Sequence, residues 1–251
     1  MSIASRLLVA AAVAAIAVAA QAGPVIGQGT WESTLKARDI NGNAVALDAA
    51  SAAFFYDTTL DVTWLRNMNV NGPMNWGSAV AWADALTTGG FTDWRLPTII
   101  DSGAPGCNLS YAGGTDCGYN VETQVGMAYS EWAHLYYVTL GNLAYCPPGD
   151  ATCAGGPQTG WGLTNTAYFD NMQSLVYWSG TEYAPGTSGA WGFFTYDGFQ
   201  DGSGKNFGLY AVAVRPGDVL AAAPEPQGYV LVLTALGALL WVRRKASSSR
   251  L

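Results

Sequence analysis

The chain has 251 residues; 12% are charged and 50% are hydrophobic, with ten tryptophans, 13 tyrosines and 31 glycines. Few charges combined with many glycines and aromatic residues are typical of an exported, turn-rich β domain and exclude a disordered polar chain. The net charge of −7 argues against nucleic acid and sulfated glycans as ligands, because an acidic surface repels polyanions.

The N-terminus has the three parts of a secretory signal peptide. Arg6 precedes an apolar run from Leu7 to Ala20, and Ala20-Gln21-Ala22 follows. A basic start, an apolar core and an A-x-A site predict export with cleavage after Ala22. The alternative, a helical N-terminus of the folded domain, leaves the agreement of these three features unexplained. Residues 23–223 then have six basic and 17 acidic residues and a net charge of −11.

Short strands and one helix are predicted in the first half of the chain. Asn41-Gly42, within residues 37–47, indicates a hairpin turn, and the β-branched and aromatic residues of 54–67 predict two strand pieces. Apolar residues at helical spacing predict a helix that Asn75 caps and that Gly89-Gly90 ends. A strand-like segment, residues 91–98, follows and stops near Pro97.

Four cysteines lie in stretches rich in glycine and proline. In an exported chain they can form disulfides, and of the three possible connectivities we expect the two local pairs. A zinc site is the alternative, but the spacing lacks C-x2-C and no histidine is near. The predicted pairs are Cys107 with Cys117 and Cys146 with Cys153.

A second helix is predicted from Ser130, its cap, to Gly141, its stop. From Leu175 onward, four strand-like segments follow one another up to Pro216. Two early helices and a late antiparallel run predict an α+β fold: two helices and a mainly antiparallel twisted sheet with long loops.

The C-terminal segment is apolar and ends in a basic cluster. Residues 228–242 hold no charged residue, and as a helix they would span about 22 Å against a hydrocarbon core of about 30 Å. A thin bilayer accommodates such a helix, and the basic cluster would stay on the cytoplasmic side. A buried core helix is the alternative, which the Pro-Glu-Pro and Ser-rich flanks argue against.

The order of Pro-Glu-Pro, apolar helix and basic cluster resembles the PEP-CTERM sorting signal of bacterial surface proteins. The resemblance implies a transient anchor in the inner membrane, cutting by an exosortase-type processing enzyme, and release to the cell surface or extracellular matrix. A permanent single-span anchor is the alternative. The residues that carry the resemblance are Pro224, Glu225, Pro226, Arg243, Arg244 and Lys245.

Segments from about Phe54 to Asp218 resemble the Lcl C-terminal domain family of bacterial surface proteins. The most specific are Trp94 to Thr98, Tyr177 to Gly180 and Ala213 to Gly217. The resemblance implies a C-type-lectin-like fold and an adhesive or ligand-binding role, although fold alone does not fix function. The chain then divides into a signal peptide (1–22), an N-terminal strand or hairpin extension (23–53), the domain (54–218), and a linker with the sorting signal (219–251).

The sequence gives no clear catalytic group. The one histidine, His134, is expected to be a satisfied, partly buried helix residue rather than a general base. Trp94 and Trp178 are expected in the core, and Arg95 and Arg215 are expected to pair with carboxylates or carbonyl groups. Formylglycine-generating relatives need catalytic cysteines near the end of the domain, and no cysteine follows Cys153.

Two candidate sites remain, both near the late strands. Asp197, Asp201 and Asn206 could present oxygens to calcium, although the same stretch reads as a hairpin loop; no other cofactor is implied. A glycan site would need exposed aromatic platforms. Its candidate residues are Glu182, Tyr183, Trp191, Phe199 and Tyr210.

These observations predict an exported binding or adhesion module, with a glycan or matrix polysaccharide as partner, transient contact with the inner membrane, and no nucleic acid. The alternatives are a structural component of an exopolysaccharide matrix and, more remotely, a hydrolase of envelope polymers, since the acidic residues offer many carboxylate pairs.

Overall fold

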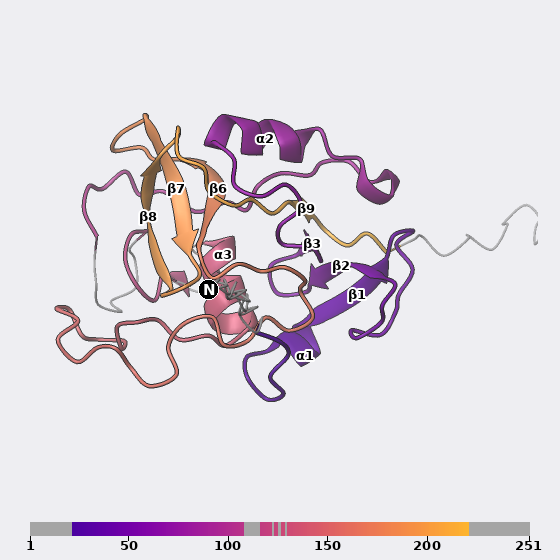
Figure 1. The fold of residues 1–251 in the computed structure, drawn as a ribbon, viewed down its shortest axis with the longest axis horizontal. Coiled ribbons are helices and arrows are strands. Elements are labelled where there is room, and N and C mark those ends of the chain that lie inside the picture. The colour runs from indigo at the N-terminus through magenta and orange to yellow at the C-terminus, as the bar shows by residue number, and fades with distance from the viewer. Residues whose placement is uncertain (1–21, 108–115, 122, 125–126, 129, 221–251) are drawn as a thin grey trace, which may run out of the picture.

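A computed structural model describes residues 22–107, 116–121, 123–124, 127–128 and 130–220 (Figure 1). Nearly all of the predicted signal peptide and all of the predicted sorting signal, including the membrane helix at 228–242, lie outside these residues. Within the described ranges, no helix is long and apolar enough to cross a membrane.

The fold is α+β, as predicted, with antiparallel sheets and short helices. One sheet has four strands in the order β1-β2-β3-β9, another has three in the order β6-β7-β8, and β4 pairs with β5 alone. In chain order the elements are α1 (Trp31–Thr34), β1 (Leu35–Asp39), β2 (Ala52–Asp57), β3 (Val62–Leu65), α2 (Trp76–Asp84), β4 (Thr123–Gln124), β5 (Met127–Ala128), α3 (Glu131–His134), β6 (Val176–Glu182), β7 (Gly189–Phe194), β8 (Phe199–Gly204) and β9 (Val214–Pro216).

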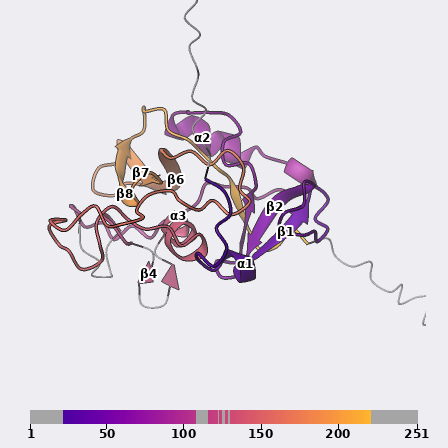
Figure 2. The ribbon, with the colours of Figure 1, turned by 60° about the horizontal axis from the view of Figure 1, so that its bottom comes forward.

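The helix α3 lies between the two larger sheets (Figures 1 and 2). Its Trp132 is fully buried. The ring contacts Trp64 of β3 at 5.5 Å between centroids, and Tyr177 of β6 at 4.6 Å. The indole N–H also donates to the carbonyl oxygen of Trp178 at 3.3 Å. One side chain therefore joins the two sheets through the core.

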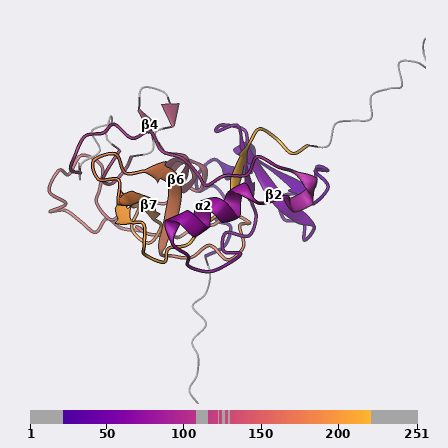
Figure 3. The ribbon, with the colours of Figure 1, turned by 90° about the horizontal axis from the view of Figure 1, so that it is seen from above.

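The two predicted helices are confirmed, with different ends. The Asn75 side chain accepts from the Ser78 N–H and starts α2, which ends at Asp84, before the predicted Gly89-Gly90 stop. The Ser130 side chain accepts from the Ala133 N–H and starts α3. After His134 the helix widens into a π-helical turn over Leu135–Thr139. In Figure 3, α2 crosses in front of β6.

The predicted N-terminal extension is part of the domain. Strand β1 pairs with β2 in an antiparallel register, and Trp31 is 2% exposed in the common core. The predicted boundary between residues 53 and 54 falls inside β2. The extension thus supplies β1, an edge strand of the four-stranded sheet.

Arg95 and Arg215 both have structural roles, as predicted. The Arg95 guanidinium donates to both carboxylate oxygens of Glu131 at 2.7 Å, and Oε2 of Glu131 also accepts from the Thr98 N–H. Arg215 donates from Nε to the Thr92 carbonyl oxygen at 3.1 Å. Trp94 and Trp178 are both buried. These residues hold the segment after α2 against the end of the four-stranded sheet.

Candidate functional site

The two disulfides form as predicted, Cys107 with Cys117 and Cys146 with Cys153. Disulfides persist in oxidising compartments, so they indicate an extracellular or periplasmic protein. The ligand atoms of Cys107, Cys117 and Asp201 lie within 4.8 Å of one another. Both sulfurs are bonded to each other, however, and offer no thiolate to a metal.

The predicted calcium residues are not brought together. Asp197 precedes β8, Asp201 lies within it and Asn206 follows it. At about 3.3 Å per residue, neighbouring members of this set are roughly 13 to 16 Å apart along the strand, whereas calcium ligands lie at about 2.5 Å from the ion. Asp197 lies in the turn before β8 and Asn206 in the turn after it, while the strand-like segment predicted at 198–202 forms most of β8. The three residues are therefore spread along β8 and do not converge on one point.

Trp191 cannot serve as an exposed platform, which corrects the sequence prediction. Its side chain is 0% exposed and packs with Ile99 and Cys117 in a small second core. The indole N–H donates to Asp101 Oδ2 at 2.7 Å. Tyr183 covers its edge at 4.9 Å between ring centroids. Strand β7 is covered on both faces, which removes this ring from solvent.

The other predicted ligand residues lie at two ends of the three-stranded sheet. Glu182 closes β6 and pairs with the Lys205 ammonium group, while Phe199 begins β8 at the opposite end, beside Phe194. Tyr210 is half-buried against Tyr177 at 5.7 Å. These side chains therefore do not form one binding surface, and only Phe199 lies in the site described next.

The turn between β7 and β8 places Asp197 beside the long loop that follows α3. Asp197 Oδ1 accepts from the Phe199 N–H at 3.0 Å, and its carbonyl oxygen accepts from the Tyr145 N–H at 2.8 Å. Glycine suits position 198, because φ is +81° and an added Cβ would press against the Tyr137 hydroxyl group. In Figure 1 this loop passes below the lower ends of β7 and β8.

Six aromatic rings lie on this turn and on the segments bonded to it, and of these the Tyr119 hydroxyl contacts the carboxylate. Tyr145 contacts Trp161 at 4.9 Å between centroids, and Tyr119 contacts Phe199 at 4.8 Å. Phe194 contacts both Phe199 and Tyr196 at 5.8 Å. Trp161 and Tyr196 are 38% and 40% exposed. We call this set the aromatic surface: Tyr119, Tyr145, Trp161, Phe194, Tyr196 and Phe199.

The carboxylate of Asp197 is half-buried and has no basic partner. Burial raises its pKa, against the hydrogen bonds that it accepts. Its Oδ2 accepts from the Tyr119 hydroxyl at 3.3 Å. Burial and the nearby carboxylate both raise the pKa of Tyr119 and Tyr196, so these hydroxyl groups keep their protons. Among the described residues, none of the ion pairs includes Asp197.

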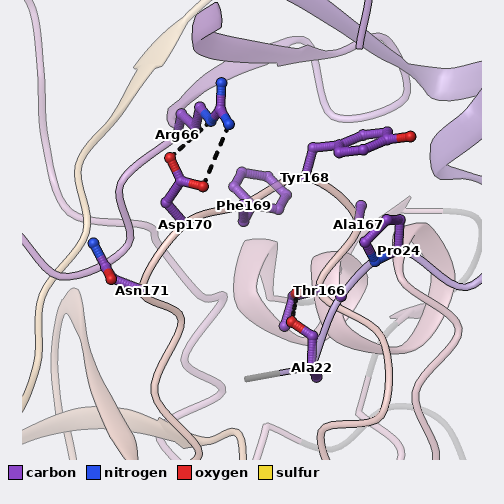
Figure 4. Close-up of a pocket in the computed structure, with 10 residues that line it drawn as sticks. Ala22, Pro24, Arg66, Thr166, Ala167, Tyr168, Phe169, Asp170 and Asn171 are labelled. Carbon is purple, nitrogen blue, oxygen red and sulfur yellow. Dashed lines mark hydrogen bonds and ion pairs between the residues drawn. The ribbon is translucent and has the colours of Figure 1, made fainter. Parts of the chain in front are cut away.

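Two hollows share Arg66 and Asp170 in their linings, and Figure 4 shows one of them with the ion pair between these residues. Their volumes are 350 and 310 Å³. Arg66 Nε lies 2.8 Å from Asp170 Oδ2, and its Nη1 donates to the Ala49 carbonyl oxygen at 2.8 Å. The Arg66 and Asp170 side chains interact with each other and with the backbone, which indicates a structural role for the pair. Trp82 lines the more apolar hollow.

His134 differs from its prediction in one respect. It is a buried helix residue, as expected, but neither ring nitrogen has a hydrogen-bond partner in the described part of the chain. Burial lowers its pKa, and the Asp57 carboxylate opposes this shift. A buried imidazole with unpaired nitrogens is held neutral, because an imidazolium there would lose its hydration.

Acidification should therefore destabilise the fold through His134. The unfolded histidine, with a pKa of about 6.5, binds more protons than the folded one, so stability from this group is complete above that pH and falls as pH drops below it. In His134→Phe, the loss of unfolding free energy between pH 7.5 and pH 5 should be smaller than in the parent. Urea unfolding at both pH values measures it; equal losses in the two proteins would contradict this assignment.

Comparison of the chain with known protein families, with curated proteins and with solved structures found no match. The aromatic surface is therefore interpreted from its own geometry. It was missed in the sequence because its rings come from three separate segments, residues 119, 145–161 and 194–199. The signal present in the sequence is the abundance of aromatic residues in an acidic chain.

Proposed function

We propose that this is an exported surface or matrix protein that binds polysaccharide through the aromatic surface. The observation that carries the proposal is a set of partly exposed rings on the segments that meet at Asp197, whose half-buried carboxylate lies at the end of the three-stranded sheet. Ligand sites combine apolar and aromatic area with a few placed polar groups. Sugar rings offer both apolar faces and hydroxyl donors, which such a surface matches.

The proposed route of the protein to the cell surface follows from its predicted signal peptide and sorting signal. The signal peptide exports the chain, and the sorting signal holds it at the inner membrane until an exosortase-type enzyme cuts it. The two disulfides support export. The C-type-lectin-like fold and kinship with the Lcl C-terminal domain family are part of this proposal, supported by the α+β class with antiparallel sheets and by the motifs quoted above.

Trp161→Ala should weaken saccharide binding and leave stability nearly unchanged, because this ring is 38% exposed and packs on Tyr145. The test is a glycan array with the exported protein, run with calcium and with chelator, followed by affinity measurement on the strongest hit. A loss of about 1 to 3 kcal/mol of binding free energy is expected for a stacked ring.

The matched control is Trp82→Ala, which removes a half-buried indole from the hollow beside Arg66. Binding that survives Trp161→Ala but not Trp82→Ala would move the site to that hollow. If no glycan on the array is bound, with calcium or with chelator, a structural matrix component would be favoured instead. Turnover that vanishes on substitution of a single carboxylate would favour the hydrolase.

A further inference from the structure

The basic side chains of the described residues bond to other groups of the fold. Among the described residues, four cations form ion pairs with carboxylates. The ammonium group of Lys36 donates to the Ser33 carbonyl oxygen, and Arg215 donates to that of Thr92. These six are all the basic residues of the segment 23–223, which has 17 acidic residues. The exported protein therefore presents an uncompensated negative charge.

Asp197 concentrates this imbalance at the aromatic surface. Its carboxylate is partly withdrawn from water, yet the two hydrogen bonds that it accepts come from neutral groups, the Phe199 N–H and the Tyr119 hydroxyl. A desolvated carboxylate without a cation is a costly arrangement in a folded protein. A cationic ligand that reached it would recover part of that cost.

The aromatic rings favour a cation as well. The face of an aromatic ring carries partial negative charge, and it attracts a cation that lies over it within about 6 Å. The Tyr119 hydroxyl bonds to the carboxylate, the Tyr145 N–H bonds to the Asp197 carbonyl oxygen, and the Trp161 ring packs on Tyr145. Lone pairs on the tyrosine hydroxyl oxygens can accept further hydrogen bonds from an ammonium group.

We propose that the aromatic surface recognises a cationic amino-sugar polymer, whose free amine binds Asp197 while its sugar rings stack on the exposed aromatic residues. This inference rests on the proposed glycan-binding function and names its ligand class. Polymers of uronic acids or sulfated sugars are excluded by repulsion from the acidic surface. Fully acetylated sugars would keep the stacking and lose the ion pair.

The direct test compares glucosamine hexamer with N-acetylglucosamine hexamer on the exported protein, at mildly acidic pH where the amines are protonated. The glucosamine hexamer should bind at least tenfold more tightly, which corresponds to about 1.4 kcal/mol. Its affinity should fall as salt is raised, because part of the attraction is between opposite charges at the protein surface. The affinity of the acetylated hexamer should not depend on salt.

Asp197→Asn should cost the glucosamine hexamer about tenfold in affinity and leave the acetylated hexamer unchanged. The asparagine oxygen can still accept from the Phe199 N–H. The charge-matched control is Asp48→Asn, an exposed residue on another part of the chain, which should change neither affinity. The salt series on the unaltered protein decides the question if Asp197→Asn does not fold.

The outcomes separate the two proposals. Equal binding of both hexamers, weakened in Trp161→Ala, keeps glycan binding and overturns the cationic ligand. Binding of a short polylysine peptide as tight as that of the glucosamine hexamer overturns it too, since the surface would then read charge and not sugar. No binding of either hexamer, with a silent glycan array, overturns the proposed function itself.

Discussion

Trp132→Ala should lower the free energy of unfolding by about 3 to 5 kcal/mol, the range observed for large aromatic side chains removed from a core. The side chain is fully buried and contacts rings of both larger sheets, Trp64 in β3 and Tyr177 in β6. It also stacks parallel to Phe193 of β7 at 6.2 Å. Its loss leaves a cavity between the sheets and an unpaired carbonyl oxygen on Trp178.

Urea unfolding of the exported protein measures this change. Trp132→Phe is the graded variant: it keeps an aromatic ring and loses the indole N–H, so about 1 to 2 kcal/mol is expected. Trp161→Ala, on the exposed aromatic surface, is the control and should leave the unfolding free energy within about 0.5 kcal/mol. A loss below about 1 kcal/mol in Trp132→Ala would mean that this side chain does not join the sheets.

Gly29→Ala is expected to cost about 3 kcal/mol, from two separate causes. The residue has φ +76°, where a Cβ costs about 1 to 2 kcal/mol. Its backbone also crosses that of Gly141, so an added Cβ would lie 2.6 Å from the Gly141 nitrogen, and overpacking costs a further 1 to 3 kcal/mol or so. This crossing docks the N-terminal segment on the end of the π-helical turn.

Gly27→Ala is the matched control for the same measurement. Gly27 has φ +78°, nearly the same as Gly29, but an added Cβ there would meet nothing within 4 Å. Only the conformational cost remains, about 1 to 2 kcal/mol. The difference between the two variants is therefore the energy of the close approach. Equal losses would show that the crossing of Gly29 and Gly141 is looser than the structure indicates.

Features that depend on neighbouring residues could be predicted from the sequence. Asn75 and Ser130 begin helices because a side-chain oxygen before an apolar helical pattern pairs with an orphan N–H group. The local cysteine pairs follow from short spacings in an exported chain. Arg95 pairs with a carboxylate because few cations are available and a guanidinium seeks two oxygens.

Features that depend on distant pairing could not be predicted. The stretch 198–202 is predicted as strand-like, although its composition also suits a loop, and only pairing with β7 decides for the strand over Phe199–Gly204, since strand formation depends on its neighbours more than on intrinsic preference. Trp161 and Trp191 cannot be told apart by residue type. One is exposed on a loop and the other is enclosed in a small core, which only the packing of the sheet decides.

The candidate site follows the same rule. Asp197 was singled out as a calcium ligand, and its true neighbours are Tyr145, 52 positions earlier, and Tyr119, 78 positions earlier. No local pattern connects these residues. The sequence signal was compositional, an acidic chain rich in aromatic residues, and composition does not show which of these residues come together.

The indole N–H signals of the tryptophans give the most direct test of the central claim, that saccharide binds at the aromatic surface. The exported protein, labelled with ¹⁵N, would be titrated with glucosamine hexamer and followed by NMR, with Trp161 and Trp82 assigned by substitution. The account predicts that the Trp161 signal shifts with added ligand while those of buried Trp191 and of Trp82 stay in place. A shift of Trp82 without one of Trp161 would contradict it and would place the ligand in the hollow beside Arg66.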